Sequence, residues 1–262
     1  MTFLSSVQGE WIEEGQPGYD GGVQPRDRQE SPLCCSSGSG RVGLPLIPEN
    51  QWISCIEKQE RHKARSLDIR KATGLKSLNQ GNTSSCWAQC VVQNFHYRQC
   101  QLGYGRTPLS PASVAGPVKS FRDVGGMVSQ AISHIHEKGI APQSHFPANA
   151  VGRQSRQYYT EETKQAALGY RAVEWWDIEP NNGAELATCL LNGFQVAICY
   201  LWMRHAVLAI DLISTAKGLA VLCDNSGYGR NSEGLTIIPQ KKAFDFDDAV
   251  AISSITATGG PA

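Results

Sequence analysis

The chain reads Asn79-Gln80-Gly81-Asn82-Thr83-Ser84-Ser85-Cys86-Trp87-Ala88 where a polar loop gives way to a predicted helix. We expect this helix over Trp87 to Gln101, because apolar residues recur on one face and Gly103 follows as a stop signal. Cys86 then stands at a helix N-terminus, where unpaired N–H groups and the positive dipole end favour a thiolate. Because the thiolate is the attacking form of cysteine, the sequence predicts Cys86 as a nucleophile.

Three segments carry a resemblance to the papain-like cysteine peptidases. Gln80 to Ala88 resembles the active-site segment of that family, and Arg204-His205-Ala206-Val207 resembles its His-Ala-Val strand. Asp224-Asn225-Ser226-Gly227 resembles its Asn-Ser-Trp-Gly segment, so that Gln, Cys, His and Asn follow one another in the family's order. The paired glycines Gly125 and Gly126 resemble those of the family's substrate cleft. The resemblance covers roughly Asp68 to Pro239.

The resemblance implies an α+β fold of two lobes, with the substrate cleft between them. It implies a papain-like peptidase domain over 64–255, in which a helical lobe (about 79–155) carries the nucleophile helix. This lobe is expected to pack against a reduced antiparallel β lobe (about 156–255). Residues 1–63, rich in Gly, Ser and Pro over much of their length, predict an extended N-terminal arm or linker, and 256–262 a C-terminal tail.

Hydrophobic periodicity places further elements in both lobes. Helices are expected over Gly126–Lys138 and Ala184–Leu191, and a short polar helix within Glu49–Ile69. Strand-like runs cover Gln195–Trp202, Ala206–Ile213, Leu219–Cys223 and Leu235–Ile238. Only Cys199 to Arg204 lie between the first of these strands and His205, where the family has a long insertion. We therefore expect a β lobe trimmed to a near-hairpin at this point.

The resemblance implies a role for each candidate residue. Cys86 would attack an acyl carbonyl, His205 would hold and return the proton, and Asn225 would orient the imidazole. Gln80 would donate its amide to the oxyanion, while Gly125, Gly126 and Trp87 would contact the substrate. Each residue also has an ordinary structural interpretation: a buried thiol, a core histidine, a turn asparagine, a loop glutamine in solvent or a pair of glycines at a helix start.

Several positions depart from the family pattern. Thr83 replaces a disulfide cysteine, and Ser84 replaces a glycine that would make the loop more permissive. Gly227 replaces the tryptophan that shields the His-Asn hydrogen bond, and without that shield the bond would be exposed and weaker. The alternative is that Tyr228-Gly229 follows a small deletion and stands for the Trp-Gly of the family. Arg204 is expected to point away from the site, because neighbours on a strand face opposite ways. The arm is much shorter than the pro-segment of secreted members, so control by a folded propeptide is not expected.

Bulk properties narrow the classes of partner. Lys plus Arg and Asp plus Glu both number 24, so no net charge recruits nucleic acid or an anionic membrane. The first ten residues lack a signal-peptide pattern and no later run is long enough to span a membrane, which predicts a cytoplasmic or otherwise intracellular protein. The nine cysteines are expected to be reduced. No metal site or cofactor is expected, because His134 and His136 diverge on a helix and Cys86 and Cys90 lack a second pair.

We therefore expect a cysteine-type peptidase acting on polypeptides through a thioester intermediate. Two alternatives remain. One is a papain-like structural or interaction module with weak or no activity, docked through residues 1–63 in a large assembly and located in a virion if the chain is viral. Its basis is the irregular arm, the trimmed β lobe and Gly227. The other is an amidase or acyl transferase acting on a non-protein substrate, which the same triad supports.

Overall fold

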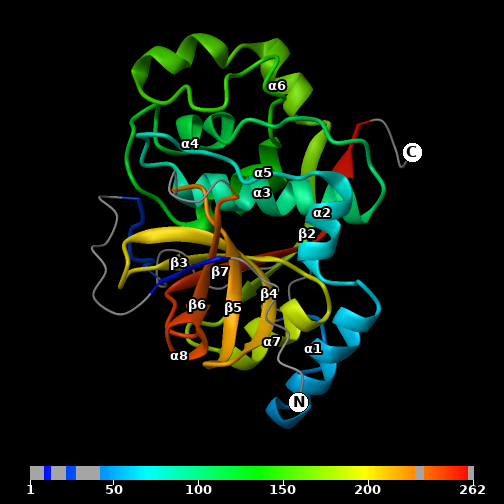
Figure 1. Cartoon of the computed structure of the whole chain (residues 1–262). Helices are drawn as coiled ribbons and strands as arrows, with labels where there is room; N and C mark the ends of the chain where they lie inside the picture. The colour runs from blue at the N-terminus through cyan, green and yellow to red at the C-terminus, as the bar shows by residue number, and fades with distance from the viewer. Residues whose placement is uncertain (1–8, 13–21, 28–41, 228–232, 259–262) are drawn as a thin grey trace.

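A computed structural model describes residues 9–12, 22–27, 42–227 and 233–258 (Figure 1). Its centre is a seven-stranded sheet in the order β1-β6-β5-β4-β3-β7-β2. Neighbouring strands are antiparallel except β1 and β6, which pair in parallel. The strands are β1 (Glu10–Trp11), β2 (Tyr170–Ile178), β3 (Val196–Tyr200), β4 (His205–Thr215), β5 (Gly218–Asp224), β6 (Leu235–Pro239) and β7 (Asp248–Ala257).

Both faces of the sheet are buried, and strand β4 shows how its sequence provides for this. Ala206 and Leu208 face one hydrophobic cluster, whereas Val207 and Ala209 face another, as the period of two requires. Every residue from His205 to Ile213 is buried, which explains the continuous apolar run predicted here as a strand. The turn between β3 and β4 spans only 201–204, so the near-hairpin expected from the sequence is confirmed.

One face of the sheet carries the helical lobe. Helix α3 (Cys86–Gln101) packs against β3, β4 and β7, and α5 (Val128–Lys138) packs against α3 and β2. The shorter helices α4 (Ala112–Val118), α6 (Glu161–Ala167) and the 3-10 helix η2 (Arg153–Tyr158) complete this part of the chain. Helix α3 is buried on nearly all sides, not only on its apolar face, because it lies between the sheet and the other helices (Figure 1).

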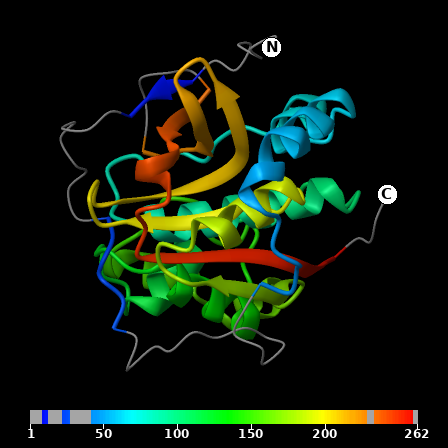
Figure 2. The same cartoon turned by 90° about the horizontal axis from the view of Figure 1, so that it is seen from below.

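The opposite face of the sheet is covered by α1 (Trp52–Arg61), α7 (Gly183–Leu191) and α8 (Gln240–Ala243), as Figure 2 shows from below. The 3-10 helix η1 (Glu49–Gln51) leads into α1, and α2 (Ser66–Thr73) follows it. The single helix expected within Glu49–Ile69 is thus two helices. They are separated at 62–65, where Lys63 has a left-handed φ of 51°.

The described parts of 1–63 are not extended throughout. Strand β1 pairs with β6, Val23 forms an isolated β-bridge with Gly126, and helix α1 places Trp52 and Ile56 in the core. The α+β fold with a helical lobe on an antiparallel sheet is confirmed, while the domain boundaries stay predictions. The seven described cysteines are free, and Cys34 and Cys35 lie outside the described residues. Among the described residues, no helix is long and apolar enough to cross a membrane.

Candidate active site

Cys86 is the first residue of α3, as the sequence predicts, and its side chain is fully buried. The thiol donates a hydrogen bond to the backbone oxygen of Gly22, 3.2 Å from Sγ. Burial raises the pKa of Cys86 to about 12, against smaller opposing effects of backbone hydrogen bonds from Ala206 and Trp87. The thiolate expected from the helix N-terminus is therefore not the favoured form here, because desolvation outweighs the helix end.

His205 begins β4 and Asn225 directly follows β5, the neighbouring strand. The two strands pair with Leu208 opposite Asp224, which brings the side chains together from 20 residues apart. His205 Nε2 lies 2.8 Å from Asn225 Oδ1, and because this oxygen can only accept, Nε2 carries the proton. Burial lowers the pKa of His205 to about 4, with the Asn225 hydrogen bond opposing the shift.

The His-Asn bond is buried, so the absence of a tryptophan at position 227 does not expose it. Tyr228 and Gly229, the alternative shield, lie outside the described residues. His205 is 0% exposed and Asn225 1% exposed. Gly227 contacts the pair closely: its N–H donates to Asn225 Oδ1 at 2.9 Å, and a Cβ atom at position 227 would lie 2.8 Å from His205 Cε1. The backbone of Gly227 thus lies against the pair at a distance that leaves no space for a side chain.

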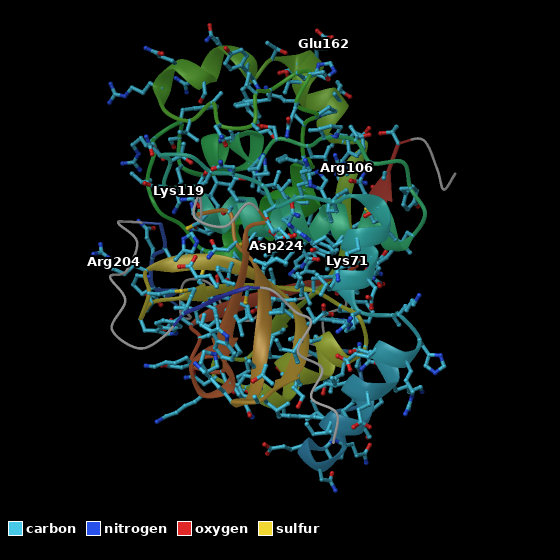
Figure 3. The ribbon with its side chains drawn as sticks, viewed as in Figure 1. Lys71, Arg106, Lys119, Glu162, Arg204 and Asp224 are labelled. Atoms are coloured by element: carbon cyan, nitrogen blue, oxygen red, sulfur yellow. The ribbon has the colours of Figure 1, made fainter. Side chains whose placement is uncertain are left out.

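The start of α3 and the start of β4 meet around the thiol. The backbone of Ala206 hydrogen-bonds the Cys86 sulfur, and Gly22 lies against both Cys86 Sγ and the Arg204 carbonyl. The residues on either side of His205 therefore border the nucleophile. Arg204 is exposed and points outward (Figure 3), as expected, although the cause differs. It lies in the turn before the strand, with a left-handed φ of 51°.

Gln80 joins the same cluster through its contacts with Ser226. Its side-chain oxygen accepts from Ser226 Oγ at 3.0 Å, and its backbone N–H donates to the Ser226 carbonyl at 3.1 Å. The amide nitrogen Nε2 donates to the Thr83 carbonyl at 2.8 Å. Gln80 is thus held beside the segment that carries Asn225, with its amide turned toward its own loop.

Gly125 and Gly126 are both buried, and Trp87 is 0% exposed. A Cβ atom on Gly126 would lie 2.5 Å from Trp87 Cε2, so the indole lies directly against the glycine backbone. Trp87 therefore supports the Gly126 segment. In the same region, Lys119 Nζ lies 5.5 Å from the centre of the indole ring.

Six residues of the arm, 22–27, lie across this site. Val23 forms a parallel bridge with Gly126: Gln24 N–H donates to the Gly126 carbonyl at 3.1 Å, and Gly126 N–H lies 3.5 Å from the Gly22 carbonyl. Lys119 Nζ donates to Gln24 Oε1 at 3.1 Å. No folded propeptide is needed to bury the thiol, because a short extended segment does so (dark blue, left edge of Figure 1).

Three charged residues beside the site, Arg26, Asp177 and Asp248, are not predicted from the sequence. Arg26 Nη2 lies 2.6 Å from Asp177 Oδ2, and Arg26 Nη1 lies 2.9 Å from Asp248 Oδ1. These side chains are at most 2% exposed. No motif surrounds them, and each reads as an ordinary surface charge. The only available signal is that both acids adjoin apolar residues, since Trp176 and Ile178 flank Asp177 and Ala249 follows Asp248.

Comparisons with known proteins place the fold. No protein-family model and no curated protein matches the chain. Among solved structures, xylellain, a cysteine protease from Xylella fastidiosa, matches with a TM-score of 0.58 at 16% identity over 70% of this chain and 83% of that one.

Two other solved structures give similar values. The bromelain protease from Ananas comosus gives a TM-score of 0.55 at 18% identity, over 72% of this chain and 97% of the other. The cysteine protease and lectin-like domains of Cwp84 from Clostridium difficile give 0.59 at 14%, over 72% and 51%. At these identities the likeness concerns the fold, and the chain therefore has the fold of the papain-like cysteine proteases.

Proposed function

We propose that the protein is a cysteine-type peptidase that hydrolyses peptide bonds with Cys86, His205 and Asn225. The observation that carries the proposal is the buried 2.8 Å hydrogen bond between His205 and Asn225, formed where the strand start meets the thiol. An asparagine oxygen on Nε2 fixes the ring orientation and leaves Nδ1 as the nitrogen for proton exchange. In the state described, burial keeps both thiol and imidazole neutral.

Displacement of residues 22–27 would open the site to substrate and water. The pKa of Cys86 then falls and that of His205 rises, because the desolvation that shifts them is relieved. The Cys86 proton passes to His205, and the thiolate attacks the carbonyl carbon to give a tetrahedral oxyanion. The Cys86 N–H and the Gln80 amide, once it leaves Thr83, would donate to this oxyanion.

Collapse of the oxyanion breaks the C–N bond, and His205 protonates the departing amine. A water molecule then gives its proton to His205 and attacks the thioester, which releases the carboxylic acid and restores the thiol. The pairing of Val23 with Gly126 supports a polypeptide over a small amide as substrate, because it places an extended backbone in the cleft with main-chain hydrogen bonds.

A single methyl group tests this function. In Gly22→Ala the new Cβ would lie 2.4 Å from Cys86 Sγ, so either the arm or the sulfur must shift. Because Cys86 is fully buried at the start of α3, we expect the arm to move off the thiol. We expect this variant to cleave an unfolded protein, and to react with iodoacetamide, at least ~10-fold faster than the wild type at pH 7, because the thiolate fraction rises as the site opens. The readouts are gel-based proteolysis and mass-spectrometric labelling of Cys86.

Two variants control the experiment. Gly105→Ala adds a methyl group where no atom lies within 4 Å, and it should behave like the wild type. Gly22→Ala combined with Cys86→Ser should abolish proteolysis. Cleavage that persists without Cys86, or a Gly22→Ala protein that labels readily yet cleaves nothing, would reject the peptidase. The second outcome would favour an interaction module or a non-protein substrate.

A further inference from the structure

Arg26 enters a pocket formed by the two carboxylates of Asp177 and Asp248. Its guanidinium meets both oxygens of Asp177, at 2.8 Å (Nη1) and 2.6 Å (Nη2), and Asp248 Oδ1 at 2.9 Å. The other oxygen of Asp248 accepts from both the N–H and the hydroxyl of Ser129, each at 3.0 Å. The pocket is therefore built by the end of β2, the start of β7 and the first turn of α5.

The sheet register ties this pocket to the nucleophile. Asp248 lies opposite Cys199 on β3, and Cys199 lies opposite Ala206 on β4. Residues directly opposite one another share a face, so the three stand in one row on the side of α3. Two strand spacings amount to about 10 Å, which is the span from Asp248 to the residue after His205. Asp177 joins the same face, because it lies opposite Val250, two residues beyond Asp248.

The arm has the length to link the two places. Gly22 contacts the Cys86 thiol and Arg26 follows four residues later, a span of about 13 Å in extended chain. Between them, Val23 makes a backbone bridge to Gly126. The arm thus contacts the thiol, pairs with the cleft glycine and fills the acidic pocket within one extended segment.

The pocket is negatively charged and therefore favours a cationic side chain. Two buried carboxylates share one guanidinium, and their desolvation is costly unless a cation faces them. When the arm is displaced from the cleft, Arg26 is displaced with it. The carboxylates of Asp177 and Asp248 then become accessible to a polypeptide that binds in place of the arm. The planar donors of arginine match one carboxylate in a bidentate manner and reach the second at the same time, which the single ammonium of lysine cannot do.

We propose that Asp177 and Asp248 form the pocket that selects an arginine side chain in the polypeptide substrate, within four residues of the scissile bond. Arg26 fills the pocket while the arm lies in the cleft. This proposal rests on the proposed peptidase function, because only a peptidase would cleave the polypeptide that carries the arginine. Recognition of arginine by the pocket is measurable without catalysis.

The first test is binding to the full-length Arg26→Gln variant, which removes the Arg26 guanidinium from the pocket. The probe is a fluorescent peptide with the sequence of residues 22–27, compared with the same peptide carrying Lys or Gln in place of Arg. We expect the arginine peptide to bind at least ~10-fold more tightly than the glutamine peptide, with lysine between them. Equal affinities for the arginine and glutamine peptides would overturn the proposal.

Matched variants localise the effect. Adding Asp177→Asn and Asp248→Asn to Arg26→Gln keeps the shapes and removes the charges of these three side chains, and it should bring the arginine-to-glutamine ratio close to 1. Adding Glu174→Gln, an exposed acid on the same strand, should leave the ratio unchanged. If Arg26→Gln does not fold, Arg26→Lys takes its place, because it retains an ion pair and loses the bidentate contact with Asp177. The same peptides then compete with an arm that binds the cleft less tightly.

A cleavage assay separates the two proposals. Peptides with Arg or Gln at each position within four residues of a cleavable bond are offered to the Gly22→Ala protein. Arginine at one position should raise kcat/KM at least ~10-fold, and Asp177→Asn with Asp248→Asn should remove the gain. Cleavage with no arginine preference rejects the pocket and keeps the peptidase. Selective arginine binding without any cleavage rejects the peptidase and keeps the pocket.

Discussion

Gly227 lies so close to its neighbours that a Cβ atom would be 2.8 Å from His205 Cε1 and 2.9 Å from Nε2. The same atom would be 3.4 Å from Asn225 Oδ1. Because His205 is fully buried, the imidazole cannot move away without displacing other core atoms. A glycine at this position therefore lets the backbone lie directly against the buried His-Asn bond.

Gly227→Ala should disturb both the pair and the fold. We expect the free energy of unfolding to fall by about 1–3 kcal/mol, as for other overpacked sites. In a Gly22→Ala background, kcat should fall more than KM rises, because the ring orientation changes and the cleft does not. Urea denaturation and steady-state kinetics measure the two effects, with Gly105→Ala as the open-space control. A variant with unchanged stability and unchanged kcat would show that the contact has no consequence.

The residues of the site differ in how well they could be predicted from the sequence. Cys86, His205 and Asn225 are found because the chemistry fixes their types and their order, and local motifs mark each one. No local motif marks Arg26, Asp177 and Asp248, because they form a cluster only in the folded chain. Arg26 is separated from Asp177 by 151 residues and from Asp248 by 222 residues in the sequence. The neutral state of the Cys86 thiol could not be predicted from the sequence either, because it depends on the tertiary contact with Gly22.

Helix α2 is short and polar, and two buried carboxylates connect it to the sheet. Asp211 on β4 accepts the N–H groups of Ser66 and Leu67, at 2.8 and 2.9 Å. At the other end of the helix, Arg70 Nη1 pairs with Asp224 at 2.6 Å. Asp224, seen in the interior in Figure 3, immediately precedes Asn225. The helix is thus attached to the strand end that delivers the asparagine.

Arg70→Met should destabilise the protein by about 3–5 kcal/mol, because it leaves Asp224 buried without its cation. The double variant Arg70→Met with Asp224→Asn should regain at least about 1 kcal/mol of that loss, since the charge is gone. Urea denaturation measures the cycle, and Arg171→Met, at an exposed position on β2, controls for loss of an arginine. Additive losses would mean that the pair is not coupled.

The helices and strands also differ in how well the sequence predicts them. The strands β3 to β6 and the helices α3, α5 and α7 carry long regular patterns, and all were predicted within a few residues. Strand β2 was not delimited, because register shifts between Ala172 and Trp175 break its alternation. Helix α4 contains Gly116 and Pro117, which read as breakers; tertiary packing stabilises it instead.

Across the whole molecule, burial of histidines links stability to pH. The pKa values of His96, His134 and His205 are each lowered to about 4, mainly by burial. An unfolded histidine takes up its proton near pH 6.5, so the unfolded state binds more protons between these values. The stability from each neutral histidine is fully present above pH 6.5 and is lost as the pH falls toward 4. Asp211, whose pKa burial raises to about 7, opposes this trend in part.

His96 isolates one of these contributions, because its Nε2 accepts the N–H of Leu109 at 3.2 Å deep in the helical lobe, away from the nucleophile. In His96→Gln the side-chain oxygen can accept the same bond and takes up no proton. The loss of unfolding free energy between pH 7 and pH 5 should therefore be smaller than in the wild type by about 2 kcal/mol, the value of 1.5 pKa units. Urea titrations at both pH values measure this difference, whatever the variant's stability at pH 7. An equal loss in His96→Gln and the wild type would show that His96 is not held neutral by the fold.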